Sequence, residues 1–300
     1  RQWSRGLGDV YKRQEMKTRL FLRTSEFLWQ EGHTAHETKE EARKETLDIL
    51  ELYRQLAEDY LAVPVLTGEK TDSEKFAGAE KTYCIEAMMG DKRALQAGTS
   101  HNLGQNFAKA FDVKFQTKDN KEEFVWATSW GVSTRLIGAI ILTHGDDKGL
   151  RLPPKIAPVQ MVIIPISKND EDEKAIKLYL DSTIKSLKME GVRIHVDWTN
   201  NTPGYKFNEW EMKGVPLRLE VGPRDIENDT VVLVRRDLGE KMFLSKKDVL
   251  STIPKLLEKI QKNLFNQAKE FRNANTHFVS SYDEFCSIMK TGGFIRCGWD

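Results

Sequence analysis

The spacing of hydrophobic and polar positions changes about halfway along this chain. In the first half, the tetrad Thr38-Lys39-Glu40-Glu41 has the form of a helix-capping box. Apolar residues then recur at helical spacing and predict a helix over about 38–61; they are Ala42, Ile49, Leu50, Tyr53, Leu56, Ala57 and Tyr60. Strand-like runs follow at 63–68, 82–89, 93–101 and 122–130. Because no long helix separates these runs, they predict an antiparallel sheet.

The second half alternates strands with helices. An apolar helix predicted over 132–145 ends at Gly145, and the pair Pro153-Pro154 marks a boundary. Beyond it, the unbroken apolar run 159–166 is typical of a strand buried on both faces. Longer helices are predicted at 170–190 and 246–272, with strands and a short helix between them. This alternation predicts a compact α/β domain.

These patterns divide the chain into four parts. Residues 15–155 form an α+β domain on the antiparallel sheet, 156–272 form the α/β domain, and 273–300 are too short to fold alone. Residues 1–14 carry arginines and glycines without an apolar segment, so we interpret them as a non-native leader.

Composition excludes several classes of protein. The 46 basic residues nearly balance the 45 acidic ones, so a nucleic-acid partner would need a local basic patch. Three scattered cysteines cannot form a disulfide framework. No apolar run is long enough for a signal or a membrane span, and we therefore expect a cytoplasmic protein without a membrane partner. A glycine-rich phosphate loop and a CxxC pair are both missing from the sequence.

Charged and polar residues stand beside apolar or small ones at several positions of the first half: Arg23, Glu31, His33, Gln96, His101 and Arg135. A guanidinium group in a site binds phosphate or carboxylate well, although structural ion pairs would explain the same pattern. His33 and His36 have a spacing that could ligate a metal, and His144-Gly145-Asp146-Asp147 resembles a metal loop. A strand end and a helix end explain these two motifs more simply.

The order of these residues is more informative than any one of them. Arg23, Phe27 and Glu31 resemble the second half of motif 2 of class II aminoacyl-tRNA synthetases, and Gly131 to Arg135 resembles their motif 3. Within that class, six blocks resemble the prolyl-tRNA synthetases of the archaeal and eukaryote-like type: 21–36, 74–80, 95–107, 129–138, 144–154 and 210–225. The resemblance implies a catalytic core on an antiparallel sheet (15–155), an anticodon-binding α/β domain (156–272) and the start of a C-terminal extension (273–300).

The resemblance also implies a role for each matching residue. ATP-binding positions are Arg13, Arg23, Gln96, Ser133 and Arg135, of which the three arginines carry the catalytic role. Proline-binding positions are Trp29, Glu31, His33, Phe76 and His101. Anticodon-binding positions are Glu211, Arg218 and Arg224. The implied cofactors are ATP and Mg²⁺, the latter held mostly by phosphates and water, and no metal site is predicted on the protein itself.

Some features depart from the family pattern. Gln14 stands where the family has Trp between Arg13 and Glu15, motif 1 with its dimer interface does not precede motif 2, and the chain stops at Asp300. We therefore expect an inactive fragment of a proline–tRNA ligase whose full-length parent is a homodimer acting on proline and tRNA(Pro). The interval between motifs 2 and 3 leaves no room for an inserted editing domain.

Two alternatives remain open at the level of sequence. One is a non-catalytic tRNA-binding paralogue, in which only the anticodon domain works. The other is a different class IIa synthetase, such as a threonyl or histidyl enzyme, which the blocks at 74–80 and 95–107 disfavour because they shape the proline pocket in the family.

Overall fold

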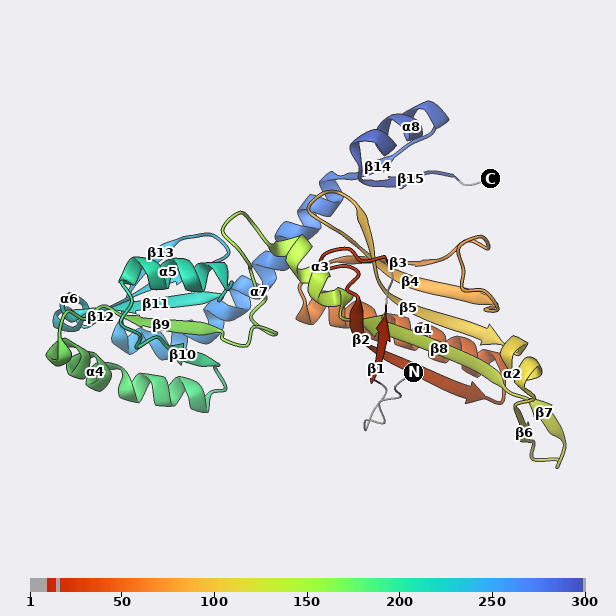
Figure 1. Ribbon diagram of the computed structural model, residues 1–300, viewed down its shortest axis with the longest axis horizontal. Helices are drawn as coiled ribbons and strands as arrows, with labels where there is room; N and C mark the ends of the chain where they lie inside the picture. The colour runs from red at the N-terminus through yellow and green to blue at the C-terminus, as the bar shows by residue number, and fades with distance from the viewer. Residues whose placement is uncertain (1–9, 15–16, 299–300) are drawn as a thin grey trace. The chain divides into compact units, whose positions relative to one another are not determined.

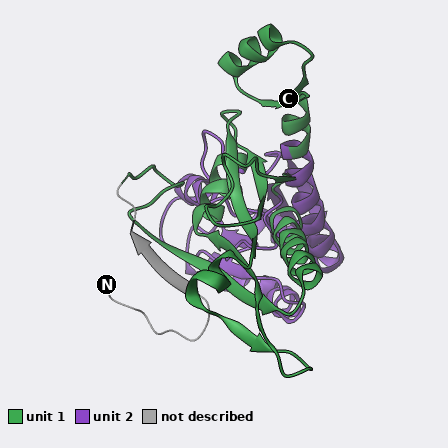
Figure 2. Cartoon of the chain, turned by 90° about the vertical axis from the view of Figure 1, so that its right-hand side faces the viewer, with its two compact units in different colours: residues 1–59, 63–143, 269–300 green, residues 60–62, 144–268 purple. Residues whose placement is uncertain are grey.

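The computed structural model describes the backbone of residues 10–14 and all of residues 17–298. The chain divides into two compact units, the first comprising 1–59, 63–143 and 269–300 and the second 60–62 and 144–268 (Figure 2). The domain borders predicted from the sequence, including the one at 155, stay predictions. Among the described residues, no helix is long and apolar enough to cross a membrane.

Unit 1 is built on a six-stranded antiparallel sheet (Figure 1). Its spatial order is β1 (Val10–Gln14), β2 (Glu26–His36), β8 (Trp126–Ser133), β5 (Ala94–Gly104), β4 (Lys81–Met88) and β3 (Val65–Glu69). The antiparallel sheet predicted from the sequence is thus present. Helix α3 (Arg135–His144) follows β8 directly, and the short helix α2 (Asn106–Phe111) and the hairpin β6 (Lys114–Gln116) and β7 (Glu122–Phe124) lie between β5 and β8 in the sequence.

Helix α1 (Lys39–Gln55) covers one face of this sheet and continues into a single π-helical turn (Leu56–Tyr60). The capping box forms as predicted, because the Thr38 side chain accepts from Glu41 N and the Glu41 carboxylate accepts from Thr38 N. The buried face of α1 carries Leu50 and Tyr53, and the Ser100 hydroxyl of β5 donates to the Thr46 carbonyl oxygen at 2.7 Å. This helix leaves the opposite face of the sheet for the site.

Two local predictions in unit 1 differ from the structure. The strand predicted at 122–130 is divided into β7 and β8, and β8 continues to Ser133 because Val132 and Ser133 pair with Gln30 and Trp29 of β2. The helix predicted from 132 therefore begins at Arg135. Within the predicted leader, residues 10–14 form β1, which pairs with β2 through backbone hydrogen bonds that do not require an apolar pattern.

Unit 1 also contains the C-terminal residues. Strands β14 (Thr276–Phe278) and β15 (Phe294–Arg296) pair in parallel, and helix α8 (Tyr282–Thr291) connects them. Arg272 donates to the Val65 carbonyl oxygen at 3.0 Å, and Gly293 N donates to the Lys92 carbonyl oxygen at 3.0 Å. The segment is therefore anchored to the strands of unit 1.

Unit 2 contains a five-stranded mixed sheet ordered β10 (Ile194–Val196), β9 (Met161–Pro165), β11 (Leu217–Val221), β12 (Thr230–Arg235) and β13 (Lys241–Ser245). As predicted, β9 is buried along its whole length and pairs in parallel with both β10 and β11. The four helices of this unit are α4 (Asp170–Met189), α5 (Pro203–Met212), α6 (Pro223–Glu227) and the long α7 (Val249–Ala274), which continues into unit 1.

Alternation along β9 assigns its residues to two apolar layers. Met161 and Ile163 pack in one cluster with buried residues of α4 and α7 such as Leu180 and Ile253. Val162 and Ile164 pack on the other face, with partly buried Phe207 and Trp210 of α5 against them. Helix α5 therefore lies on the face opposite α4 and α7, and Glu211 lies in its last turn.

Candidate functional site

A cavity of about 250 Å³ lies over β2, β8 and β5 in unit 1. Six residues singled out in the sequence line it: Trp29, Glu31, Gln96, His101, Ser133 and Arg135. Strand register explains this convergence, since Glu31 lies opposite Gly131, which in turn lies opposite Thr99. Residues directly opposite each other on neighbouring strands project from the same face of a sheet. Residues two positions apart on one strand do so as well. The structure thus brings together residues separated by more than a hundred positions in the sequence.

Gly131 lies in the middle of this row and keeps the cavity open. A Cβ added at Gly131 would lie 3.3 Å from the Gln30 carbonyl oxygen and 3.5 Å from the Trp29 ring. A side chain there would occupy the space beside Trp29. The glycine that resembles the start of motif 3 therefore has a physical role in the cavity wall.

Arg135 is the first residue of α3, and backbone carbonyl groups hold its guanidinium. Nε donates to the Leu22 oxygen and Nη1 to the Gln96 oxygen, each at 3.3 Å, and the Ser133 hydroxyl accepts from Arg135 N at 3.3 Å. Both carbonyl groups accept hydrogen bonds and thereby fix the direction of the guanidinium. Arg135 is thus held in a geometry that suits an anion in the cavity.

A second hollow of about 200 Å³ adjoins the first and shares Phe27, Ser133 and Arg135 with it. Arg23 and Thr24 line this second hollow. Arg23 and Arg135, which the resemblance implied as nucleotide-binding residues, therefore line the same hollow, and their roles stay predictions.

Sequence reasoning missed Lys70, which follows β3. Its Nζ donates to Gln96 Oε1 at 2.6 Å, so a cation orients the side-chain amide at one end of the cavity. A single lysine in a polar loop gives no local signal, and only the cross-strand contact reveals it.

His101 and Phe76 form the aromatic end of the site. Their ring centroids lie 5.1 Å apart, and Phe76 also stacks with Phe107 at 6.1 Å. Phe76 is 48% exposed and does not line the cavity itself. Burial, reinforced by the charge of Lys70, lowers the pKa of His101 to about 4. The imidazole is therefore neutral at pH 7.

Two other residues implied by the resemblance lie apart from the cavity. The His33 side chain is 59% exposed, with Nε2 3.5 Å from the Glu31 carboxylate, and it does not line the cavity. Arg13 has its backbone on β1 opposite Phe27, while its side chain lies outside the described residues. The roles of both residues stay predictions.

The two metal-like motifs have ordinary structural explanations. His36 Nε2 lies 2.7 Å from the Thr34 hydroxyl at the end of β2. His144 is buried, its Nε2 bonds the Leu61 carbonyl oxygen at 3.0 Å, and burial lowers its pKa to about 4. Within residues 17–298, no group of three or more His, Cys, Asp or Glu side chains is placed to hold a metal ion.

Unit 2 contains a separate pocket of about 230 Å³ that Glu211 and Arg218 line. Five basic side chains surround it: Lys148, Arg218, Arg235, Arg236 and Lys241. Arg218 donates from Nε to Glu220 at 2.9 Å and lies over the Phe207 ring at 4.3 Å. Glu211 lies 3.3 Å from Lys148 Nζ. This is a local basic patch of the kind that a nearly neutral chain needs for binding nucleic acid.

Arg224 does not join this pocket. It is exposed near the start of α6, beyond the end of β11, whereas Arg218 lies at the beginning of that strand. The resemblance implied that Glu211, Arg218 and Arg224 all bind the anticodon. Glu211 and Arg218 line the pocket, whereas Arg224 does not. The reason is that Arg218 lies near one end of β11 and Arg224 follows its other end.

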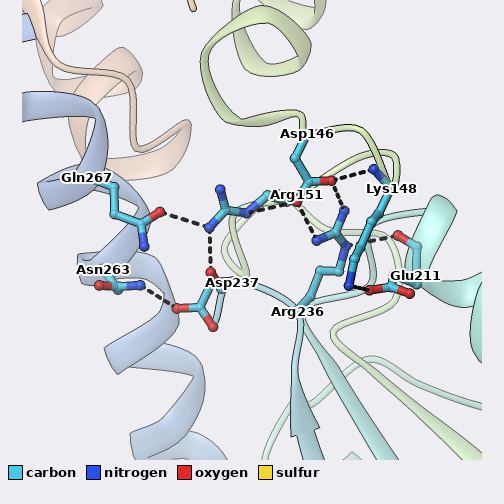
Figure 3. A network of polar contacts seen from close by, with 8 residues as sticks. All are labelled: Asp146, Lys148, Arg151, Glu211, Arg236, Asp237, Asn263 and Gln267. Atoms are coloured by element: carbon cyan, nitrogen blue, oxygen red, sulfur yellow. Dashed lines mark hydrogen bonds and ion pairs between the residues drawn. The ribbon is translucent and has the colours of Figure 1, made fainter. Parts of the chain in front are cut away.

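A polar network contacts Glu211 through its carbonyl oxygen and its carboxylate (Figure 3). Arg236 donates to both carboxylate oxygens of Asp146, at 2.8 and 2.5 Å, and from Nε to the Glu211 carbonyl oxygen at 3.0 Å. The Asp146 carboxylate also accepts from Lys148 N at 3.0 Å. Hydrogen bonds from Arg236 lower the pKa of Asp146. The loop that resembled a metal site is therefore held by an arginine.

The same network continues to α7. Arg151 donates to the Asp237 carbonyl oxygen at 2.5 Å and to Gln267 Oε1 at 2.8 Å, and Asn263 Nδ2 donates to Asp237 Oδ2 at 2.6 Å. These contacts tie the loop at 146–151 to the end of β12 and to α7 within unit 2 (Figure 3).

Comparison with known protein families matches both units. Residues 6–144 match the core domain of class II tRNA synthetases for Gly, His, Pro, Ser and Thr, and residues 160–256 match an anticodon-binding domain. A class II aminoacyl-tRNA synthetase core followed by an anticodon-binding domain is therefore the class of protein present here. The fold class predicted from the sequence is confirmed.

Individual relatives define the family more narrowly. The chain is 57% identical over 290 residues to a proline–tRNA ligase of Chlorobium phaeobacteroides strain BS1, covering 96% of this chain and 60% of that protein. It is 54% identical over 289 residues to a proline–tRNA ligase of Bacteroides fragilis, covering 96% of this chain and 58% of that protein.

A solved structure gives the same result. The crystal structure of prolyl-tRNA synthetase from Cryptosporidium parvum, complexed with L-proline and AMP, matches with a TM-score of 0.91 and 45% identity, covering 97% of this chain and 63% of that one. Along 96% of its length the chain is similar to prolyl-tRNA synthetases, which confirms the resemblance and disfavours a threonyl or histidyl enzyme. It spans about 60% of the length of the curated relatives it matches.

Proposed function

We propose that this protein is a proline–tRNA ligase, which uses ATP to form prolyl-adenylate and transfers proline to tRNA(Pro). One observation carries the proposal: residues expected to bind proline (Trp29, Glu31 and His101) and residues expected to bind ATP (Gln96, Ser133 and Arg135) line the same 250 Å³ cavity. A reaction between an amino acid and a nucleotide needs such a shared space, because catalysis of adenylate formation is mainly positioning and charge stabilisation.

The amino-acid end of the cavity suits proline. The Trp29 ring offers an apolar wall for the pyrrolidine ring, and the Glu31 carboxylate can accept from the imino group. Glu31 is the one acidic side chain that lines the cavity among residues 17–298, which supports a cationic nitrogen beside it. The Phe76 ring beside His101 supports the same end from outside the cavity.

The nucleotide end is assigned to the two arginines. Arg23 and Arg135 line the adjoining hollow, where charge-assisted hydrogen bonds would hold phosphate oxygens. Mg²⁺ is expected with the nucleotide, but the described residues provide no carboxylate cluster that would hold it alone. The ion would therefore be bound mainly by phosphates and water, and no step of the proposal depends on a protein-held metal.

The unit 2 pocket is assigned to the anticodon. Arginine donors suit the O6 and N7 acceptors of guanine, and a carboxylate suits its N1 and N2 donors. Arg218 and Glu211 supply these groups in one pocket ringed by basic side chains. Nη1 of Arg218 contacts no acceptor within the described residues, so its hydrogens can serve a base. The cytoplasmic location and the homodimer of the full-length protein remain predictions that accompany this proposal.

The test is pyrophosphate exchange with ATP by the full-length protein. We expect exchange that depends on proline, and only background exchange with threonine or histidine at the same concentration. Exchange driven equally by threonine or histidine would contradict the amino-acid assignment. A complete lack of exchange, with tight binding of tRNA(Pro), would instead favour the non-catalytic tRNA-binding paralogue.

A further inference from the structure

A buried threonine connects His101 of the proposed proline pocket with Phe76, which lies beside it. Thr82 lies on β4 directly opposite His101 of β5 and is 1% exposed. Its Oγ1 lies 2.9 Å from His101 Nδ1 and 3.0 Å from the backbone nitrogen of Phe76. One hydroxyl group therefore contacts both residues, and no local pattern in the sequence distinguishes Thr82.

The number of hydrogens on each group decides which atom donates in these two hydrogen bonds. The Phe76 N–H can only donate, so Thr82 Oγ1 accepts this hydrogen bond. The hydroxyl has one hydrogen of its own, and His101 Nδ1 is the one acceptor that contacts Oγ1 among the described residues. If Nδ1 carried a hydrogen, the buried hydroxyl hydrogen would have no acceptor. That penalty disfavours the Nδ1–H tautomer by roughly fivefold to a hundredfold.

The His101 imidazole is also neutral, so only one of its two nitrogens carries a hydrogen. Burial and the nearby Lys70 charge lower the pKa of His101 to about 4, so at pH 7 the ring has one hydrogen to place. With Nδ1 accepting from Thr82, that hydrogen lies on Nε2. Nε2 contacts no protein acceptor within the described residues, and His101 lines the cavity, so the Nε2 hydrogen is available to a ligand there.

We propose that Thr82 is a positioning residue that fixes His101 as the Nε2–H tautomer, so that the cavity wall presents a neutral hydrogen-bond donor to the substrate. The identification of this substrate as proline rests on the proposed function. Proline offers its imino group as a donor and its carboxylate as an acceptor, so a donor at His101 faces the carboxylate oxygen or, after activation, the acyl oxygen. The same hydroxyl holds the Phe76 backbone and thereby places the Phe76 ring beside the imidazole.

The loop that carries Phe76 has further anchors that keep it in place. Asn106 Nδ2 donates to the Gly78 carbonyl oxygen at 2.9 Å, and Glu80 N donates to the Asn102 carbonyl oxygen at 2.9 Å. Gly78 has φ +92°, and a Cβ there would lie 2.8 Å from the Phe107 ring. Loss of the Thr82 hydroxyl is therefore expected to change the tautomer and the pocket without releasing the whole loop.

The tautomer can be measured directly on the chain by ¹⁵N NMR of labelled histidine at pH 7. Loss of one signal set in His101→Gln assigns the residue among the six histidines of the sequence. We expect the Nε2–H pattern for wild type and for Thr82→Ser, which keeps the hydroxyl. In Thr82→Val, which removes the hydroxyl at nearly equal volume, we expect the Nδ1–H fraction to rise at least about fivefold.

A matched control uses another buried threonine of the same sheet. Thr128 on β8 is fully buried, and its hydroxyl bonds that of Thr34 at 2.5 Å, so Thr128→Val removes a buried hydroxyl without touching His101. His101 should keep the Nε2–H pattern in this variant. An Nδ1–H pattern in wild type, or an unchanged tautomer in Thr82→Val, would overturn the proposal.

The functional consequence is measured in the full-length protein by pyrophosphate exchange. Thr82→Val should raise KM for proline by about tenfold, leave KM for ATP nearly unchanged, and be rescued by Thr82→Ser. A tautomer change without a change in KM for proline would overturn the role of His101 as donor. If wild type showed no proline-dependent exchange, the proposed function would fail, while the NMR result would still decide the tautomer.

Discussion

At the scale of single residues, Arg135 offers the sharpest test of the nucleotide site. Backbone carbonyl groups of Leu22 and Gln96 orient its guanidinium, and Arg135 lines both the cavity and the adjoining hollow. Removing one preorganised donor from a transition state typically costs about 3 kcal/mol. Arg135→Ala in the full-length protein should therefore lower kcat for pyrophosphate exchange by about a hundredfold.

The control for this prediction is Arg93→Ala. Arg93 is exposed and its partner is Asp91, so its loss should leave exchange unchanged. Thermal melting should show little change for either variant. Near-normal turnover of Arg135→Ala would mean that this arginine only stabilises the start of α3.

A second prediction at this scale concerns pH. The folded-state pKa of His144 is about 4, below its ordinary value of 6.5, so the unfolded chain binds a proton more readily between these values. The stabilisation is fully present above pH 6.5 and is lost as pH falls toward 4. His144→Gln keeps a donor for the Leu61 carbonyl oxygen but cannot titrate in this range. We expect this variant to lose about 2 kcal/mol less of its free energy of unfolding than wild type between pH 7 and pH 4.5.

Urea unfolding followed at both pH values measures this difference. His33→Gln is a control for the substitution itself, because the His33 side chain is mostly exposed. Parallel pH profiles for wild type and His144→Gln would show that the neutral, buried imidazole does not contribute.

At the scale of elements, the sequence predicted those features that a local pattern encodes. The capping box and apolar spacing identified α1, and the unbroken apolar run identified β9 as a strand buried on both faces. Residues 10–14 were missed because VYKRQ carries no alternation, and its strand forms only through pairing with β2. Thr82 and Lys70 were missed for a related reason: each acts on a residue of another strand, which no local spacing reveals.

The anticodon prediction belongs to this scale, because it depends on where α5, β11 and α6 place their side chains. Glu211→Ala and Arg218→Ala, made in the whole chain, should each lose about 1–3 kcal/mol of discrimination for guanine over adenine in a proline anticodon stem-loop. Arg224→Ala should have a smaller effect, since Arg224 lies outside the pocket that the other two line.

Fluorescence titration of guanine-containing and adenine-substituted stem-loops measures this discrimination. Arg236→Lys is a second test variant, because it removes the hydrogen bond from Arg236 Nε to the Glu211 carbonyl oxygen and the paired hydrogen bonds to Asp146. It should weaken discrimination in the same direction as Glu211→Ala. Equal weakening for every stem-loop would mean that the pocket contributes only backbone affinity.

At the scale of the whole molecule, the chain has separate hydrophobic cores in its two units. Ile253 of α7 is fully buried in the core of unit 2, while Ile85 of β4 is buried within unit 1. Truncating a buried isoleucine to alanine typically costs about 2–5 kcal/mol. Because each side chain belongs to one unit, Ile85→Ala should destabilise unit 1 selectively and Ile253→Ala should destabilise unit 2 selectively.

Hydrogen exchange read by mass spectrometry in moderate urea resolves this effect along the sequence. Ile85→Ala should speed exchange in β4, β5 and β8 and leave β9 and β11 protected, and Ile253→Ala should do the reverse. Faster exchange in both sheets with either variant would mean that the chain unfolds as one cooperative body. Selective loss would show that the two units can be destabilised separately, so a loss of stability caused by one substitution can be assigned to one core.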